Sequence, residues 1–237
     1  DKCAQIIYPV PVKEGIIMRL ILVMLFLLLY FIVSIPIFGI EWIIGKINPH
    51  ARDISSLRIV QFGFKGILFF SGTKTTVIGF ENILFVGKHK SFYDVVISYS
   101  MMPNLTGFVA KKEIEKVPLL RTWMRFVYCL FLDRDNLKEG LKTILQGIEY
   151  IKRGISIVIF PEGTRNTFED GMLPFKEGSL KFAEKSGCLI IPMVQNNTGE
   201  CLEKHMPWIR KAHTVIEFCE PVDIKLLDKE DKKHVAA

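Results

Sequence analysis

The chain has 237 residues, of which 49% are hydrophobic, with a mean hydropathy of +0.28 and a formal net charge of +6. This length is enough for one sizeable core, so we expect a single catalytic domain. Lysine and arginine are spread along the chain without a basic block, a zinc-finger or an aromatic RNA-binding signature. We therefore expect no nucleic-acid partner, and a bilayer surface and a phosphorylated substrate fit the charge better.

The first predicted element is a long apolar helix over residues 15–45. Its central part, residues 20–40, contains no charged residue and has the length that crosses a bilayer. A buried core helix is the alternative, whereas a secretory signal peptide would have a shorter apolar core and a small-residue cleavage site. Pro36 allows a kink or an early end of this helix. The chain begins at Asp1 and not at Met, which is typical of a fragment or a processed form.

A second, amphipathic stretch follows at residues 57–71. It predicts an interfacial helix or the second arm of a helical hairpin, which leaves open whether the segment spans the bilayer or enters one leaflet. Basic residues flank both ends of the first helix, so the positive-inside rule only weakly favours a catalytic domain on the cytoplasmic side. We expect residues 1–72 to form membrane-associating helices, and residues 73–237 to form a catalytic α/β domain on the cytoplasmic face of the membrane.

From residue 75 onward, short apolar runs alternate with helical stretches. We expect strands at 75–79, 84–87, 107–110, 129–132, 156–160, 189–194 and 214–218, and helices at 93–101, 119–126, 137–153 and 177–186. This alternation is typical of an α/β fold in which a largely parallel mixed sheet is covered by helices on both faces. Here the sheet is preceded by the N-terminal pair of apolar helices.

Two polar segments follow apolar runs, at the sheet edge where α/β proteins bind ligands. Residues 160–165 place a carboxylate, a glycine and a guanidinium after one expected strand, and His89 and Asp94 follow another. A spacing of five residues places two side chains about 140° apart on a helix, so the pair can meet only if His89 precedes the helix and Asp94 lies in its first turn. Ser91 is a suitable N-cap for that helix.

The chain shows no enzyme nucleophile beside this histidine. It lacks a Gly-x-Ser-x-Gly elbow and metal-ligand spacing, and its five cysteines have no CxxC pairing and are interpreted as reduced structural thiols in a cytosolic setting. A base without a nucleophile suits direct activation of a substrate hydroxyl. Arg165 would then bind an anion on the acceptor, and Lys111, Lys112 and Arg134 follow two other expected strands and could converge there; a surface role is the alternative for both lysines.

Several blocks occur in the order that is typical of one family. They are His89–Asp94 (HxxxxD), Phe131–Arg134, Phe160–Arg165 (FPEGTR) and Ile191–Met193, and Phe108–Glu113 is similar to a further family segment. Over residues 75–220 the chain thus resembles the 1-acyl-sn-glycerol-3-phosphate (lysophosphatidic acid) acyltransferases of the glycerolipid acyltransferase superfamily. It departs from the family at Lys88, Arg121 and Tyr128-Cys129, where the family commonly has asparagine, glycine and glycine, and these departures bear on the acceptor.

The resemblance implies that His89 is the general base and Asp94 its partner. It implies that Glu162, Gly163, Thr164 and Arg165 shape the acceptor site and that Lys111 and Arg134 help to bind phosphate. The implied reaction takes an acyl group from acyl-CoA or acyl carrier protein to the sn-2 hydroxyl of lysophosphatidic acid, with no cofactor and with membrane lipids as partners. The alternatives are another lysolipid or glycerol 3-phosphate as acceptor, a thioester or lysolipid hydrolase, and a non-catalytic lipid-binding protein.

Overall fold

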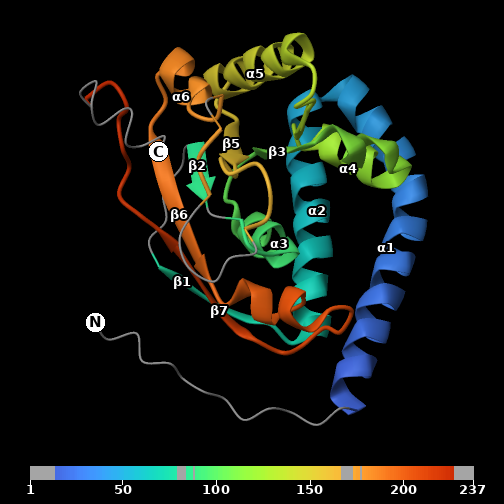
Figure 1. Ribbon diagram of the computed structural model, residues 1–237. Coiled ribbons are helices and arrows are strands. Elements are labelled where there is room, and N and C mark those ends of the chain that lie inside the picture. Colours follow the sequence, from blue (N-terminus) through green and yellow to red (C-terminus); the bar gives the residue numbers. More distant parts are fainter. Residues whose placement is uncertain (1–13, 79–83, 88, 167–172, 177, 227–237) are drawn as a thin grey trace.

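The computed structural model describes residues 14–78, 84–87, 89–166, 173–176 and 178–226, and Figure 1 shows the arrangement of their helices and strands. The helices are α1 (Glu14–Ile47), α2 (Pro49–Ser71), α3 (Phe92–Met101), η1 (Lys112–Lys116), α4 (Pro118–Phe126), α5 (Leu137–Lys152), α6 (Lys181–Ser186), η2 (Thr198–Glu200) and η3 (Glu203–His205). The strands are β1 (Lys74–Ile78), β2 (Leu84–Gly87), β3 (Thr106–Lys111), β4 (Leu130–Leu132), β5 (Ser156–Ile159), β6 (Ile190–Asn196) and β7 (His213–Phe218).

The seven strands form one sheet in the order β1-β7-β6-β2-β5-β3-β4. Every neighbouring pair runs parallel except β6 and β7, which are antiparallel. The prediction of a largely parallel mixed sheet is therefore confirmed.

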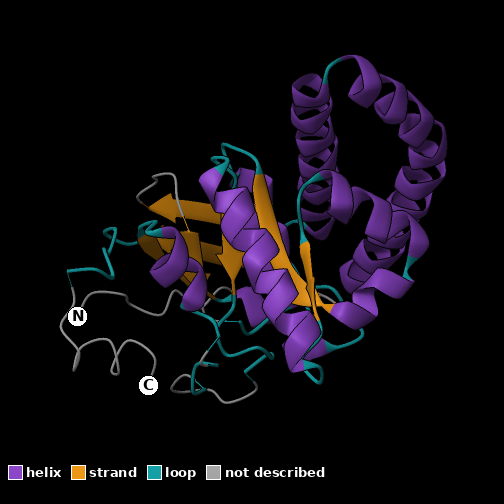
Figure 2. Cartoon of the chain, turned by 90° about the horizontal axis from the view of Figure 1, so that it is seen from above, coloured by secondary structure: helices purple, strands orange, loops and turns teal. Residues whose placement is uncertain are grey.

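Alternate residues of the central strand β5 face two different cores. Val158 belongs to a cluster with residues of α2 and α3, whereas Ile157 and Ile159 belong to a second cluster that includes Phe182 of α6. Side chains of successive strand residues point to opposite faces, so helices cover both faces of the sheet as the sequence predicts. Figure 2 shows the sheet seen from above, with helices around it.

The N-terminal helices α1 and α2 lie side by side and are joined at Asn48 (Figures 1 and 2). The expected start of the second helix at residue 57 is wrong, because the Asn48 side chain accepts a hydrogen bond from Ala51 N–H (3.1 Å) and Pro49 occupies the first turn, where proline is well tolerated. Two glycines of α2 allow α1 to approach it closely. A Cβ at Gly63 would lie 2.9 Å from the Tyr30 ring, and one at Gly66 would overlap the Phe26 ring.

Helix α1 has the length and the composition to cross a membrane over Gly15–Ile47, and it continues through Pro36 without the early end that the proline allowed. Only 11% of its most apolar stretch is buried. Large side chains such as Leu25, Leu28 and Leu29 are about half exposed. The structure thus leaves a continuous apolar surface on α1 that the other described residues do not cover.

Helix α2 also packs into the core that supports the sheet. Leu57, Val60 and Ile67 share one buried cluster with Val96 and Ile97 of α3. A buried hydrogen bond from the Trp123 indole N–H to Ser34 Oγ (2.9 Å) ties α1 to α4 as well. The apolar helix pair is therefore held rigidly against the α/β domain.

The turn after α4 contains a backbone conformation that favours glycine. Tyr128 has a φ of 60°, in the left-handed region, and it belongs to the Tyr128-Cys129 pair at which the sequence departs from a common glycine. Its hydroxyl donates to Asp53 Oδ2 of α2 (2.6 Å), and its carbonyl lies against Gly107 of β3, where a Cβ would overlap it. The side chain therefore joins α2 to the edge of the sheet.

The remaining element boundaries agree with the sequence to within a few residues, with one exception. Helix α6 covers Lys181–Ser186, whereas the sequence predicts a helix from residue 177, which lies outside the described residues together with residue 79 of the first expected strand. Residues 178–180 form turns instead of helix. Gly187 ends α6 in the left-handed conformation (φ 74°), as its position predicts.

We expect Gly107→Ala to lower the free energy of unfolding by about 1–3 kcal/mol, because the new methyl group would overlap the backbone of Tyr128. Gly199→Ala is the matched control, since a Cβ there meets only the Lys204 side chain at 3.9 Å. Denaturant unfolding of both variants in mild detergent checks this. Equal stability of the two variants would show that the turn can move aside.

Candidate active site

The candidate site lies where five parallel strands end. Strands β2, β3, β4, β5 and β6 run in the same direction, so the residues that follow them gather at one edge of the sheet. The residues at this edge are His89, Lys111, Arg134, Glu162, Gly163, Thr164, Arg165 and, after β6, Glu203. The topology therefore brings all the predicted site residues to the same side of the fold.

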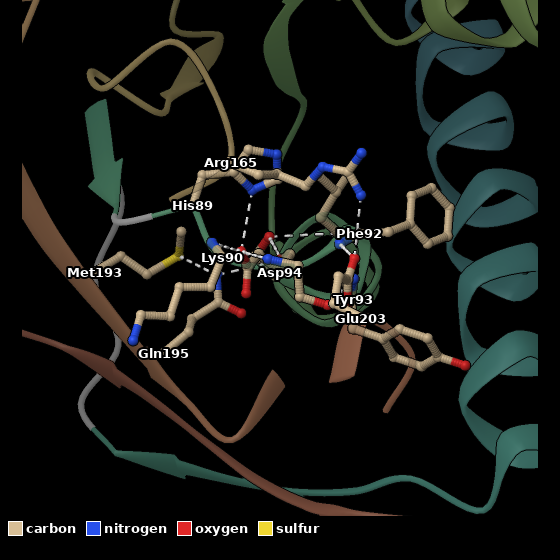
Figure 3. Close-up of polar contacts among 12 residues, drawn as sticks. His89, Lys90, Phe92, Tyr93, Asp94, Arg165, Met193, Gln195 and Glu203 are labelled. Carbon is tan, nitrogen blue, oxygen red and sulfur yellow. Dashed lines mark hydrogen bonds and ion pairs between the residues drawn. The ribbon is translucent and has the colours of Figure 1, made fainter. Parts of the chain in front are cut away.

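His89 and Asp94 form the central pair (Figure 3). His89 lies in the loop after β2, Asp94 lies in the first turn of α3, and His89 Nδ1 is 3.0 Å from Asp94 Oδ2. The Asp94 side chain is 1% exposed and the His89 side chain 20% exposed. The predicted geometry, with the histidine before the helix and the aspartate in its first turn, is confirmed.

Asp94 Oδ2 also accepts hydrogen bonds from the backbone N–H groups of Lys90 (2.6 Å) and Ser91 (2.7 Å). Ser91 caps α3 as predicted, since its hydroxyl accepts from Tyr93 N–H (3.0 Å). An ionised carboxylate only accepts hydrogen bonds, so we assign the proton to His89 Nδ1, which leaves the lone pair of Nε2 free. Nε2 can therefore take a proton from a substrate.

The other side of His89 rests on the segment after β5. The His89 and Phe160 rings are stacked, with centroids 4.4 Å apart and an interplanar angle of 19°. The Asn166 N–H donates to the His89 carbonyl (2.7 Å), so the two motif-bearing loops are joined through their backbones as well. This fixes the imidazole from two directions.

The turn at residues 161–165 depends on its glycine and its buried glutamate. Gly163 has a φ of 73°, a conformation that other residues rarely adopt. Glu162 is 1% exposed and accepts a hydrogen bond from Leu173 N–H (3.0 Å), so it holds the far end of the loop. Thr164 and Arg165 are exposed. Glu162 and Gly163 thus shape the turn, and the two exposed residues are free to meet a substrate.

Two further predicted cations lie at this edge. Arg134 donates to the Gly163 carbonyl, and partial burial lowers the pKa of its guanidinium. Lys111 is exposed at the end of β3, whereas its neighbour Lys112 pairs with Asp133 (2.8 Å). Arg134 therefore braces the turn that carries Arg165. Lys111 has no ion pair within the described residues.

Two site residues were missed by the sequence reasoning. Glu203 contacts Ser91 and Phe92, which are more than a hundred residues away in sequence, and Arg165, which is 38 residues away. No motif marks Glu203. Gln195 of β6 donates to the backbone carbonyl of Asp94 (3.2 Å) and is buried. The sequence signal that could have indicated Gln195 is a polar residue near the end of an otherwise apolar strand.

The described cysteines have the character of structural thiols. Cys129, Cys188, Cys201 and Cys219 are free. Burial raises the pKa of both Cys129 and Cys201 to about 12. Thiols with raised pKa values are poor nucleophiles at neutral pH, in keeping with a site that activates a substrate hydroxyl directly.

Comparison with known proteins places this chain in a family. The profile of the family described as Acyltransferase matches residues 72–196, more than half of the chain. Among curated proteins, a 1-acyl-sn-glycerol-3-phosphate acyltransferase of Saccharomyces cerevisiae is 29% identical over 166 residues, which are 67% of this chain and 55% of the relative. The enzyme of the same name from Haemophilus influenzae is 33% identical over 156 residues, which are 65% of this chain and 63% of the relative.

The aligned region spans somewhat less than two thirds of these curated relatives. Among solved structures, the 1-acyl-sn-glycerophosphate (LPA) acyltransferase from Thermotoga maritima superposes with a TM-score of 0.71 at 22% identity. The superposition covers 92% of this chain and 95% of that one. It shows that the two chains share a fold, including the helices that precede the sheet.

Because the pKa values of their thiols are raised, Cys129 and Cys201 hold almost no thiolate at pH 8, and we expect both to resist alkylation in the folded protein. Iodoacetamide treatment followed by peptide mass spectrometry measures this. Denatured protein, in which both residues should react, is the control. Rapid modification of Cys129 in the folded state would show a reactive thiol and contradict its structural assignment.

Proposed function

We propose that this chain, which belongs to the acyltransferase family, transfers an acyl group from acyl-CoA or acyl carrier protein to the sn-2 hydroxyl of lysophosphatidic acid, giving phosphatidic acid. The observation that supports this most directly is the His89–Asp94 pair, with Nε2 available at the strand edge that also carries Arg165. The names of the similar acyltransferases support the choice of acceptor.

In the proposed reaction, His89 Nε2 takes the proton of the acceptor hydroxyl. The oxygen attacks the carbonyl carbon of the donor thioester, the new ester C–O bond forms and the C–S bond breaks. The leaving thiolate takes the proton back from the imidazolium. Asp94 stabilises the charged imidazolium through Nδ1 in the intermediate state.

The acceptor phosphate would be held by the cations at the same edge. Arg165 is half exposed and is the last residue of the turn at residues 161–165. Its planar guanidinium can therefore bind phosphate oxygens in a bidentate way. Lys111 is available as a second positive charge, and Arg134 keeps the turn in place through the Gly163 carbonyl. A phosphate clamp is of little use to a thioester hydrolase, and an oriented base is of little use to a lipid-binding protein.

We further propose that the exposed face of α1 lies in the bilayer and that the α/β domain faces the cytoplasm. Exposed side chains on α1 provide the apolar surface, and free cysteines are typical of a reducing compartment. A site beside the membrane lets both lipid chains stay in hydrocarbon, since each CH₂ transferred to water costs about 0.8 kcal/mol.

The direct test is an assay on purified protein in detergent with labelled acyl-CoA and several acceptors. Formation of labelled phosphatidic acid from lysophosphatidic acid supports the proposal. Release of free fatty acid without an ester product would favour the hydrolase. No turnover with any donor, despite bound lipid, would favour the binding protein.

We expect His89→Ala and Asp94→Ala to lower turnover by about a hundredfold or more, because loss of a general base typically costs 10² to 10⁴ in rate. Binding of lysophosphatidic acid should stay nearly unchanged, since neither residue belongs to the phosphate clamp. Steady-state kinetics and a direct binding measurement separate the two effects. Near-normal turnover of His89→Ala would end the mechanism.

Arg165→Lys keeps the positive charge but loses the planar fork, so we expect mainly a higher KM for lysophosphatidic acid. An acceptor without a phosphate group should lose less in this variant. The comparison of KM values for the two acceptors is the measurement. An equal loss for both acceptors would make Arg165 a structural residue.

For the membrane surface, we expect a Leu25→Glu and Leu29→Glu double variant to be released by alkaline carbonate, whereas the unchanged protein stays in the membrane fraction. The matched control is Leu141→Glu with Leu145→Glu on α5. These leucines have the same spacing and similar exposure, 54% and 53% against 50% and 53%. Release of both variants, or of neither, would contradict the assignment of α1.

A further inference from the structure

Glu203 lies outside every recognised motif block, yet it sits against the start of the catalytic helix. It belongs to η3 in the connection after β6. One of its carboxylate oxygens, Oε2, accepts a hydrogen bond from the Ser91 hydroxyl (2.5 Å) and the other, Oε1, accepts from Phe92 N–H (2.6 Å). Figure 3 shows the Glu203 carboxylate beside Phe92, with a dashed line to Arg165.

The same carboxylate faces Arg165. Arg165 Nη1 is 3.4 Å from Glu203 Oε1, which makes Glu203 the anion that the described residues present to this guanidinium. We propose that Glu203 is a positioning residue that aligns Arg165 with the N-terminus of α3, and so places the phosphate clamp at a fixed distance from His89. This inference rests on the proposed function.

The contacts of Glu203 complete the cap of α3. The first backbone N–H groups of this region are divided among three acceptors: Asp94 takes those of Lys90 and Ser91, Ser91 Oγ takes that of Tyr93, and Glu203 takes that of Phe92. A negative charge at this end of a helix is also favoured by the helix dipole. Glu203 is therefore held in place independently of Arg165.

The arrangement parallels the one at His89. Asp94 orients the base and Glu203 orients the clamp, and both carboxylates bind backbone N–H groups at the start of α3. Arg165 is 51% exposed and uses one guanidinium N–H for Glu203, so its remaining donors can reach a phosphate. The base and the clamp would thus both be positioned relative to the N-terminus of α3.

A competing role for Glu203 gives the opposite result. If its carboxylate occupied the place of the substrate phosphate, the acceptor would have to displace it from Arg165. Two features argue against displacement: the side chain is only 18% exposed, and its short hydrogen bonds to Ser91 and Phe92 do not depend on Arg165. Removing the charge should therefore weaken acceptor binding.

The test is Glu203→Gln, which keeps an acceptor for Phe92 N–H but removes the charge opposite Arg165. We expect the KM for lysophosphatidic acid to rise about three- to tenfold while kcat stays within about twofold. Glu200→Gln is the matched control, because it removes the same charge from the same loop, where Glu200 pairs with Lys204 (2.7 Å) and not with Arg165. Its KM should stay within about twofold of the unchanged protein.

A double-mutant cycle separates positioning from simple capping of the helix. In an Arg165→Ala background, the further effect of Glu203→Gln on KM should fall to about twofold or less, because the residue it positions is gone. The same rise in both backgrounds would show that Glu203 acts only on the stability of α3 and would overturn the proposal. A lower KM for Glu203→Gln would overturn it in favour of competition.

Two further measurements keep the result interpretable. If the unchanged protein does not acylate lysophosphatidic acid, the proposed function fails; the Kd for lysophosphatidic acid in detergent then replaces KM in the same cycle. If Glu203→Gln does not fold, Glu203→Asp retains the charge on a shorter side chain and is measured in its place. Failure of both variants to fold would assign Glu203 to stability alone and would overturn the positioning role.

Discussion

One carboxylate oxygen, Asp94 Oδ2, is the point on which the site depends. It gathers the His89 imidazole and the backbone N–H groups of Lys90 and Ser91 at the start of α3. The same contacts set where the helix begins and which imidazole nitrogen is free. Since an unpaired buried carboxylate is costly, the loop after β2 has little freedom to place His89 elsewhere. The catalytic geometry is therefore a consequence of how a helix is capped.

The sequence predicted the sheet and most of the site because both follow from short-range patterns. Apolar runs placed the strands, and parallel strands bring their carboxyl ends together, so His89 and Arg165 were expected at one edge. The start of α2 at Pro49 was missed because the prediction followed the apolar residues from Leu57 and overlooked Asn48 as a cap. The contact of Glu203 with Phe92 could not be predicted, since it joins the first residues of η3 and α3, which are 111 residues apart in sequence.

The helix pair and the α/β domain behave as one packed body. Leu57 and Ile67 of α2 are buried with Val96 of α3, the helix that carries Asp94. Glycines at 63 and 66 let α1 lie close against α2, which leaves the opposite face of α1 exposed. The exposed face of α1, which we propose lies in the bilayer, thus belongs to the same packed body as the base. The orientation of α1 at a bilayer would fix the direction in which the site faces.

At Tyr128 a backbone conformation that favours glycine coincides with a hydrogen bond that needs a side chain. A left-handed backbone costs a residue with a side chain about 1–2 kcal/mol relative to glycine. The hydrogen bond from its hydroxyl to Asp53, a charged acceptor, is of similar size and offsets that cost. A glycine there would relax the backbone but lose the hydrogen bond to Asp53 of α2. A strained backbone at one residue thus helps to hold a helix through a side chain that lies 75 residues earlier in the chain.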